Sequence, residues 1–322
     1  MGLLNISRIN VASRIASIRC RQLGCVRHST TMAPAPKQSR TLLLLPPPPS
    51  PSSYAALKAA YHSPLFTVLK ELARARHPSQ EQALLEIALP VPELYGRLSA
   101  PRGPLYATTQ QLVADLYKLI CITASREAID TEDAEGVDAR VILVAYPRDG
   151  RITAPPPDST SEEEMQGPAI DIQTLAQSSR TWETVYSVES EEGERLLKSF
   201  QSSSKTTRNV SRVRGGIVSV EKTGQGTPSI EPSDDSVNHL SVAVGGTFDH
   251  LHIGHKLLLT MFAFTLGRRQ PSSSSSKPSI LTVGITGDAL LVNKKYAEHL
   301  ESWKRREEKG SMTSRQQSAK SR

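Results

Sequence analysis

The chain has 322 residues, which is enough for one large domain or two small ones with a buried core. Its mean hydropathy of -0.33 and its low aromatic content of 5% are typical of a protein with sizeable polar segments. No apolar run reaches the roughly 18 residues that a membrane helix needs, so we expect no transmembrane span.

The three cysteines, Cys20, Cys25 and Cys121, show neither the spacing of a metal site nor an even disulfide framework. They therefore indicate a reducing compartment. Cys121 lies in an apolar segment with helical periodicity, residues 112–122, and we expect its side chain to be buried there as a small hydrophobe.

The net charge of +7 is unevenly distributed along the chain. Residues 1–70 carry +9 with no acidic residue, residues 71–240 carry -9, and residues 241–322 carry +7. No basic stripe interleaved with aromatic side chains is present, so the sequence does not favour nucleic-acid binding. The basic C-terminal region instead suits a polyphosphate substrate.

The first 53 residues are expected to form a disordered leader. Residues 1–31 combine five arginines with apolar residues and serines and contain no acid, which is typical of a mitochondrial transit peptide. The alternative is an untargeted extension ahead of a cytoplasmic protein that starts at Met32. The four prolines at 46–49 predict a stiff spacer, so ordered structure should begin near Tyr54.

Residues 54–200 are expected to form an α/β or α+β region. Apolar residues recur at helical spacing over residues 65–72 and 112–120. A third helix is predicted at residues 84–87, because a Ser79-x-x-Gln82 capping box precedes them.

Strands are predicted at residues 141–145 and 184–188, followed by a short helix at 192–200. The acidic, proline-containing stretch 154–167 should be a solvent-exposed loop. Residues 201–238 are expected to be a linker, apart from a possible strand at 216–220.

From residue 239 the pattern changes. An apolar strand at 240–244 leads into a glycine turn, a helix at 256–266, a serine-rich loop at 272–276 and a strand at 280–285. This order predicts a right-handed parallel crossover, which is the first unit of a doubly wound sheet.

Ligands of such a sheet bind beyond the carboxyl ends of the strands, so residues 245–249 and 287–295 should face one site. Glycines allow close approach of the backbone to phosphate, and a helix N-terminus supplies free N–H groups. His252 and His255 lie on one face of the first helical turn and both point at one anion. Thr247 offers a hydroxyl group.

A cation is expected from the end of the second strand, where Lys294 and Lys295 compete. No serine or cysteine nucleophile stands beside a base, and no carboxylate pair is placed for hydrolysis. The pattern therefore predicts direct phosphoryl or nucleotidyl transfer, assisted by a divalent metal.

Several neighbouring residues have simpler interpretations. Asp249 is expected to cap the helix or to fix the loop. His250 and Lys256 have no partner that the sequence identifies. His299, Trp303 and the charged run 304–309 are expected to form a solvated helix face.

Gly246-Thr-Phe-Asp249 followed by His252-x-Gly-His255 resembles the signature of the HxGH nucleotidyltransferase superfamily. The longer form, Gly-Gly-Thr-Phe-Asp-His-Leu-His-x-Gly-His-Lys, is most similar to the eukaryotic, particularly fungal, phosphopantetheine adenylyltransferases. The stretch that begins Asp288-Ala-Leu-Leu adds to the match. The resemblance covers residues 239–306 and implies a Rossmann-like, cytidylyltransferase-like domain.

The resemblance implies transfer of AMP from ATP to 4′-phosphopantetheine in coenzyme A biosynthesis, giving dephospho-coenzyme A and pyrophosphate. By motif position, His255 would stabilise the transferring phosphate and His252 would contact the phosphates of ATP. Thr247 would bridge ATP and the acceptor phosphate, which Lys294 would hold. Mg²⁺ would accompany ATP, with no protein ligand assigned. Two residues would line the nucleotide through their backbone, Gly246 and Phe248.

The family continues to an Ile-Ser-Ser-Thr-x-x-Arg type motif that this sequence lacks, and residues 307–322 form a polar tail. We therefore expect a domain truncated after two of five strands, with part of the apolar stripe of helix 256–266 uncovered. Two alternatives stay open: a catalytically incompetent fragment or interaction protein of the same family, and a cytidylyltransferase for another phosphorylated substrate.

Overall fold

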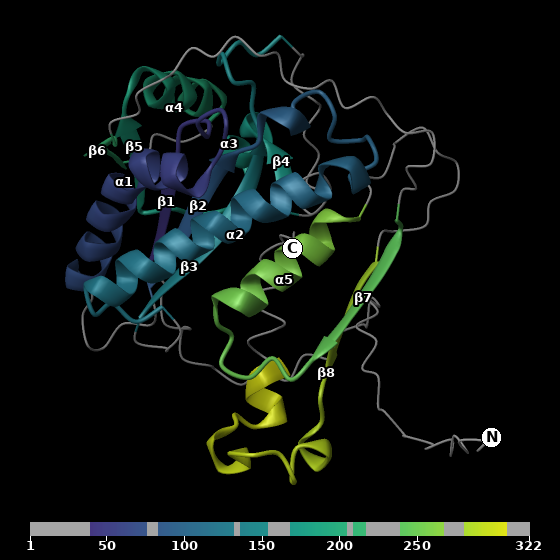
Figure 1. The fold of residues 1–322 in the computed structure, drawn as a ribbon. Coiled ribbons are helices and arrows are strands. Elements are labelled where there is room, and N and C mark those ends of the chain that lie inside the picture. The colour runs from purple at the N-terminus through teal and green to yellow at the C-terminus, as the bar shows by residue number, and fades with distance from the viewer. Residues whose placement is uncertain are drawn as a thin grey trace, which may run out of the picture.

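The computed structural model describes residues 39–75, 83–131, 136–153, 168–204, 209–216, 239–266 and 280–307. These residues form a six-stranded sheet and a separate two-stranded sheet, both parallel and both flanked by helices (Figure 1). The predictions for residues 1–38, 79–82, 154–167, 205–208, 217–238, 272–276 and 308–322 lie outside the described residues.

The large sheet has the strand order β4-β3-β2-β1-β5-β6. The chain moves outward from β1 through β2 and β3 to β4, and then returns to β5 on the other side of β1. This reversal defines a doubly wound sheet and confirms the α/β prediction. The strands are β1 (Arg40–Leu44), β2 (Ala83–Pro90), β3 (Val137–Ala145), β4 (Ala169–Asp171), β5 (Thr184–Glu189) and β6 (Asn209–Arg214).

Helices cover both faces of this sheet (Figure 1). α1 (Tyr54–Ala75) and α2 (Gly103–Arg126) pack on the face that buries Leu43. α3 (Ile172–Gln177) and α4 (Glu191–Ser203) pack on the face that buries Leu42 and Leu44. Alternate residues of β1 thus point to opposite cores, as expected for a central parallel strand. A 3-10 turn, η1 (Pro92–Leu94), follows β2.

The prediction that order begins near Tyr54 is wrong. β1 lies inside the predicted leader, and its residues 42–44, with Leu45, are completely buried at the centre of the sheet. The leucine run is therefore a strand, and the four prolines that follow it form the loop into α1. A buried strand with both faces covered has no alternation of polar and apolar residues, so it lacks the usual sequence pattern of a strand. The proline run that follows instead suggested a disordered spacer.

Two further local predictions are corrected. Residues 84–87 form part of β2, because a short apolar run fits a buried strand as well as a helix. Cys121 lies on the exposed side of α2, so it is not a core residue. In addition, β6 lies within the segment expected to be a linker. The predicted strands at 141–145 and 184–188 and the helix at 192–200 are confirmed.

The second unit contains β7 (Ser241–Gly246), α5 (Ile253–Phe264) and β8 (Ile280–Ile285), with β7 and β8 paired in parallel. The predicted β-α-β crossover is confirmed. Two 3-10 turns follow β8, η2 (Asp288–Leu290) and η3 (Ala297–His299). In Figure 1 this final segment wraps around the end of β8 and the N-terminal end of α5.

Most of the apolar stripe of α5 is covered, and part of it stays uncovered as expected, because Leu258 is 37% exposed. α5 lies beside α2 (Figure 1). Its residues Ile253, Met261 and Phe264 join the core beneath α1 and α2, in the unit built on the six-stranded sheet, which we call the N-terminal domain. Lys256 has a partner there too, because its Nζ lies 2.7 Å from Oδ1 of Asp138 on β3. Within the described residues, no helix combines the length and apolarity needed to cross a membrane.

Candidate active site

The loop between β7 and α5 has a constrained backbone. Phe248 and His250 adopt positive φ angles of 52° and 41°, a left-handed conformation that is uncommon for residues other than glycine. The side chain of Phe248 is buried, packing with Val244 and Leu259. Burial of this ring anchors the loop, while the adjacent Thr247 remains half-buried with its hydroxyl near the surface.

His252 and His255 form a stacked pair at the start of α5. His252 is the N-cap residue, and its Nδ1 accepts a hydrogen bond of 3.1 Å from the backbone N–H of Gly254. The two ring centroids are 3.9 Å apart. A Cβ atom on Gly254 would lie 2.9 Å from the His252 ring, so any other residue at this position would displace that ring.

The surroundings of His255 favour its neutral form. Burial lowers its pKa, and the neighbouring His252 lowers it further, against weaker opposing effects of the His250 backbone and Asp249. An anion bound beside the ring would oppose both effects and favour protonation of His255.

Lys294 reaches the motif loop from the segment after β8. Its Nζ donates a hydrogen bond of 3.3 Å to Oγ1 of Thr247, and the side chain is otherwise exposed. Lys295 instead lies over the ring of Tyr296, at 4.9 Å from the centroid. The geometry therefore distinguishes the two lysines and brings Lys294 to the site.

Arg306 holds the loops of the site together from a buried position, and it was not predicted from the sequence. Its side chain is completely buried, and it donates hydrogen bonds of 2.8 to 2.9 Å to the carbonyl oxygens of Thr247, Thr286 and Glu301. It also pairs with Asp288. The prediction that residues 304–309 form a solvated face is therefore wrong at Arg306. One arginine within a charged run gives no sequence signal of its burial.

Asp249 fixes the loop, one of the two roles expected for it. Its Oδ1 accepts a hydrogen bond of 2.8 Å from the backbone N–H of Glu301, and the Glu301 carboxylate accepts one of 3.3 Å from the N–H of His250. His250 Nε2 also lies 3.3 Å from the carbonyl oxygen of His299. These contacts supply partners for His250 and tie the motif loop to the last described segment.

The structure thus gathers all the residues singled out from the sequence around one loop: Gly246, Thr247, Phe248, His252, His255 and Lys294. Hydroxyl, imidazole and ammonium groups converge there at a helix N-terminus, an arrangement suited to binding phosphate oxygens. The individual roles stay predictions. Within the described ranges, no three His, Cys, Asp or Glu side chains cluster as a metal site would require.

The large sheet is poorly equipped for the same task. The crevice where its strand order reverses opens between the loops after β1 and β5, and a cavity of about 390 Å³ lies there. The loop after β1 contains the four prolines at 46–49, which have no N–H to offer a phosphate. Arg148 and Ser190 also line this cavity, but among the described residues the histidine pair, Thr247 and Lys294 all lie in the second unit.

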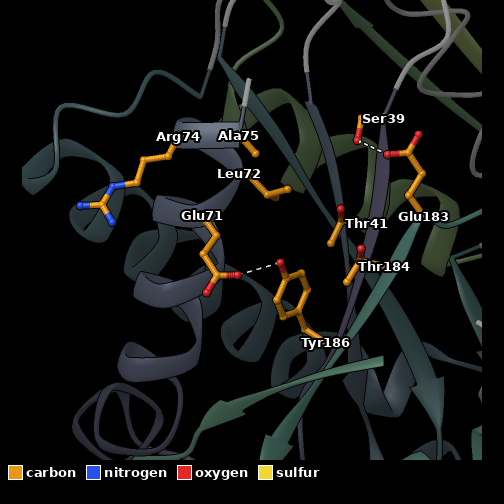
Figure 2. A pocket seen from close by; sticks show the side chains of 9 residues that line it. All are labelled: Ser39, Thr41, Glu71, Leu72, Arg74, Ala75, Glu183, Thr184 and Tyr186. Carbon is orange, nitrogen blue, oxygen red and sulfur yellow. Dashed lines mark hydrogen bonds between the residues drawn. The ribbon is translucent and has the colours of Figure 1, made fainter. Parts of the chain in front are cut away.

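Another cavity, of about 500 Å³, lies at the opposite ends of β1 and β5 (Figure 2). Its polar groups largely satisfy one another, because Ser39 donates to Glu183 over 2.8 Å and Tyr186 donates to Glu71 over 2.7 Å. Burial, with help from Glu71, raises the pKa of Tyr186 to about 12. The tyrosine is therefore a stable hydrogen-bond donor in this wall.

Comparisons with known proteins agree with this division. Short partial matches to phosphopantetheine adenylyltransferases indicate that the chain contains a nucleotidyltransferase-like region. The family described as a domain of unknown function, DUF8446, matches residues 32–219, more than half of the chain. The chain belongs to this family.

Partial relatives extend the comparison. An uncharacterized protein of Schizosaccharomyces pombe is 36% identical over 134 residues, covering 40% of this chain and 36% of the relative. Phosphopantetheine adenylyltransferase of Saccharomyces cerevisiae is 43% identical over 72 residues, covering 22% of this chain and 20% of the relative. The enzyme of that name from Pyrococcus abyssi is 43% identical over 65 residues, covering 20% of this chain and 34% of the relative.

The chain thus spans between a fifth and about a third of the length of these relatives. No solved structure gives a significant match to it.

Proposed function

We propose that the chain transfers AMP from ATP to 4′-phosphopantetheine, forming dephospho-coenzyme A and releasing pyrophosphate. The observation that carries this proposal is the convergence of the stacked His252–His255 pair with the Lys294–Thr247 contact at the N-terminus of α5. The partial identity with phosphopantetheine adenylyltransferases supports the choice of substrates.

The geometry suits a transfer without a covalent enzyme intermediate. A phosphate oxygen of the acceptor would attack the α-phosphorus of ATP, and pyrophosphate would leave as the new bond forms. His255 would donate to the oxygens of the transferring phosphate, and His252, half-buried beside it, would contact the departing phosphates. Each contact strengthens as negative charge builds up in the transition state, which is how it would lower the barrier.

Lys294 and Thr247 would hold the second substrate. Lys294 is exposed and already directed at the Thr247 hydroxyl, so an acceptor phosphate could bind between them and replace their direct hydrogen bond. The backbone of Gly246 and Phe248 would line the nucleotide. Mg²⁺ would arrive bound to the phosphates of ATP and reduce their charge, with no protein ligand assigned to it.

The test is an assay of the purified chain with ATP, Mg²⁺ and 4′-phosphopantetheine that follows both pyrophosphate and dephospho-coenzyme A. We expect His255→Ala and Lys294→Met each to lower the rate about 100-fold or more, the scale of losing one transition-state donor. Lys295→Met is the matched control and should retain the wild-type rate. A wild-type rate no higher than that of His255→Ala would favour the incompetent fragment. A preference for CTP would favour a cytidylyltransferase.

A further inference from the structure

α5 is attached to the N-terminal domain at both of its ends. Near its start, Lys256 is almost completely buried, and its Nζ pairs with Asp138 of β3 at 2.7 Å. At its end, the carbonyl oxygen of Phe264 accepts a hydrogen bond of 3.2 Å from Nη1 of Arg102, the N-cap residue of α2. The guanidinium also lies 5.3 Å from the Phe264 ring centroid.

The Lys256–Asp138 pair is poorly explained as a source of stability alone. Both side chains are 4% exposed, so each charge loses most of its hydration on folding. Such buried pairs often contribute less stability than a well-packed apolar pair of similar volume. What the pair does provide is a fixed orientation of the Lys256 side chain, because a buried ammonium group must lie next to its carboxylate.

That direction matters because Lys256 directly follows His255. Successive residues of an α-helix point about 100° apart, so fixing Lys256 toward β3 fixes the rotation of the first turn. The same rotation sets where His255 points, and the backbone N–H of Lys256 bonds at 3.1 Å to the carbonyl oxygen of His252. The pair therefore bears on both imidazoles, although Asp138 touches neither.

Asp138 is itself held in place. Arg140, two residues along β3, pairs with its other carboxylate oxygen, and Lys256 Nζ also lies 3.5 Å from the carbonyl oxygen of Thr131. The carboxylate therefore presents one oxygen to Arg140 and the other to Lys256. Asp138 thus links β3 to α5 through Lys256.

We propose that the N-terminal domain serves as the scaffold that orients the motif histidines, with Asp138 as a positioning residue acting through Lys256. This assigns a function to a domain family described as one of unknown function, and it rests on the proposed AMP transfer for its kinetic consequence. Its structural consequence, the stacking of His252 on His255, is independent of the reaction.

The experiment uses the full chain and separates orientation from stability. Asp138→Asn leaves the Lys256 charge buried without its partner and should lower both Tm and kcat. The double variant Asp138→Leu/Lys256→Met replaces the pair by apolar groups and should restore Tm to within a few degrees of wild type. Its kcat for AMP transfer should stay about tenfold or more below wild type, with the KM for ATP changed about twofold or less.

Asp171→Asn is the control for general destabilisation. Asp171 is the last residue of β4 and caps α3, at the opposite end of β3 from Asp138, and it accepts a hydrogen bond from the N–H of Thr174. This variant should lower Tm and leave kcat unchanged. If the double variant regains both Tm and kcat, the pair has a merely structural role and the proposal fails. It also fails if Asp138→Asn changes neither quantity.

A second readout keeps this test distinct from that of the proposed function. Proton NMR of the imidazoles should show cross-peaks between the His252 and His255 rings in the wild type, and these should weaken in the folded double variant. If the wild type transfers no AMP, the proposed function fails, and the scaffold is judged on this spectrum. Unchanged cross-peaks in the double variant would overturn it.

Discussion

His252 and His255 place their ring centroids 3.9 Å apart, with the His255 ring also 5.3 Å from that of Phe248. Partial burial lowers the pKa of His255, and the neighbouring imidazole lowers it further. An anion bound beside this ring would favour its protonated form, so the arrangement suits a phosphate ligand.

The first prediction concerns the pKa of His255. In the free protein it should titrate below its usual value of about 6.5. His252→Ala should raise that pKa, because it removes the neighbouring ring and opens His255 to water. Addition of a non-hydrolysable ATP analogue to the wild type should raise it as well. The measurement is an NMR titration of the imidazole protons.

The control for this titration is His299→Ala, which removes an exposed imidazole from the far side of His250. This substitution should leave the pKa of His255 unchanged. A pKa of His255 that is unchanged or lower in His252→Ala would contradict the coupling of the two rings.

A second prediction concerns acid stability. Burial alone would raise the pKa of Asp138, but Lys256 and Arg140 outweigh this and hold it well below its usual range. A carboxyl group with a lowered folded-state pKa contributes stability above its unfolded value of about 4, and this contribution is lost as the pH falls below it. The wild type should therefore destabilise more steeply in acid than Asp138→Leu/Lys256→Met.

The difference is measurable by denaturant titration from about pH 6 to about pH 3. Each proton taken up only on unfolding steepens the loss of stability by about 1.4 kcal/mol per pH unit. Parallel curves for the two proteins over this range would show that Asp138 does not carry the acid sensitivity.

A third prediction concerns Arg306. Arg306→Met removes the donors for three backbone carbonyl oxygens and leaves those oxygens without this partner, at a cost of roughly 3 kcal/mol. Because those carbonyls belong to the motif loop, the end of β8 and the last described segment, these parts should loosen together. Hydrogen exchange should accelerate over residues 241–266 and 280–307, with less change in the N-terminal sheet.

Lys304→Met is the control. Lys304 is an exposed cation of the same segment, so its loss should cost less than about 1 kcal/mol. Equal exchange in the two variants would remove Arg306 from its organising role.

Sequence reasoning was most successful where a residue's neighbours in space are also its neighbours in the chain. The β-α-β crossover and the shared face of His252 and His255 follow from local spacing. The rule that parallel strands end at one edge predicts a lysine at the site, and the family resemblance selects Lys294 over Lys295. Asp138 and Arg306 were not identified, because Asp138 pairs with Lys256, 118 residues away, and Arg306 binds two carbonyl groups that are 20 and 59 residues away. β1 was missed for a related reason: only the six-stranded sheet shows that its leucines are buried on both faces.

The last prediction concerns Gly254, which separates the two histidines. In Gly254→Ala the new Cβ would lie 2.9 Å from the His252 ring, so that ring must move away. Alanine favours a helix over glycine by about 1 kcal/mol, while the lost capping bond from Gly254 to His252 costs about the same. Tm should therefore change little, whereas the stacked pair should separate.

The ring cross-peaks and AMP transfer should both decline in Gly254→Ala. The control is Gly287→Ala, where a Cβ meets no atom within 4 Å, and it should change neither. A Gly254→Ala protein with intact stacking and full activity would show that the close approach at this glycine has no functional consequence.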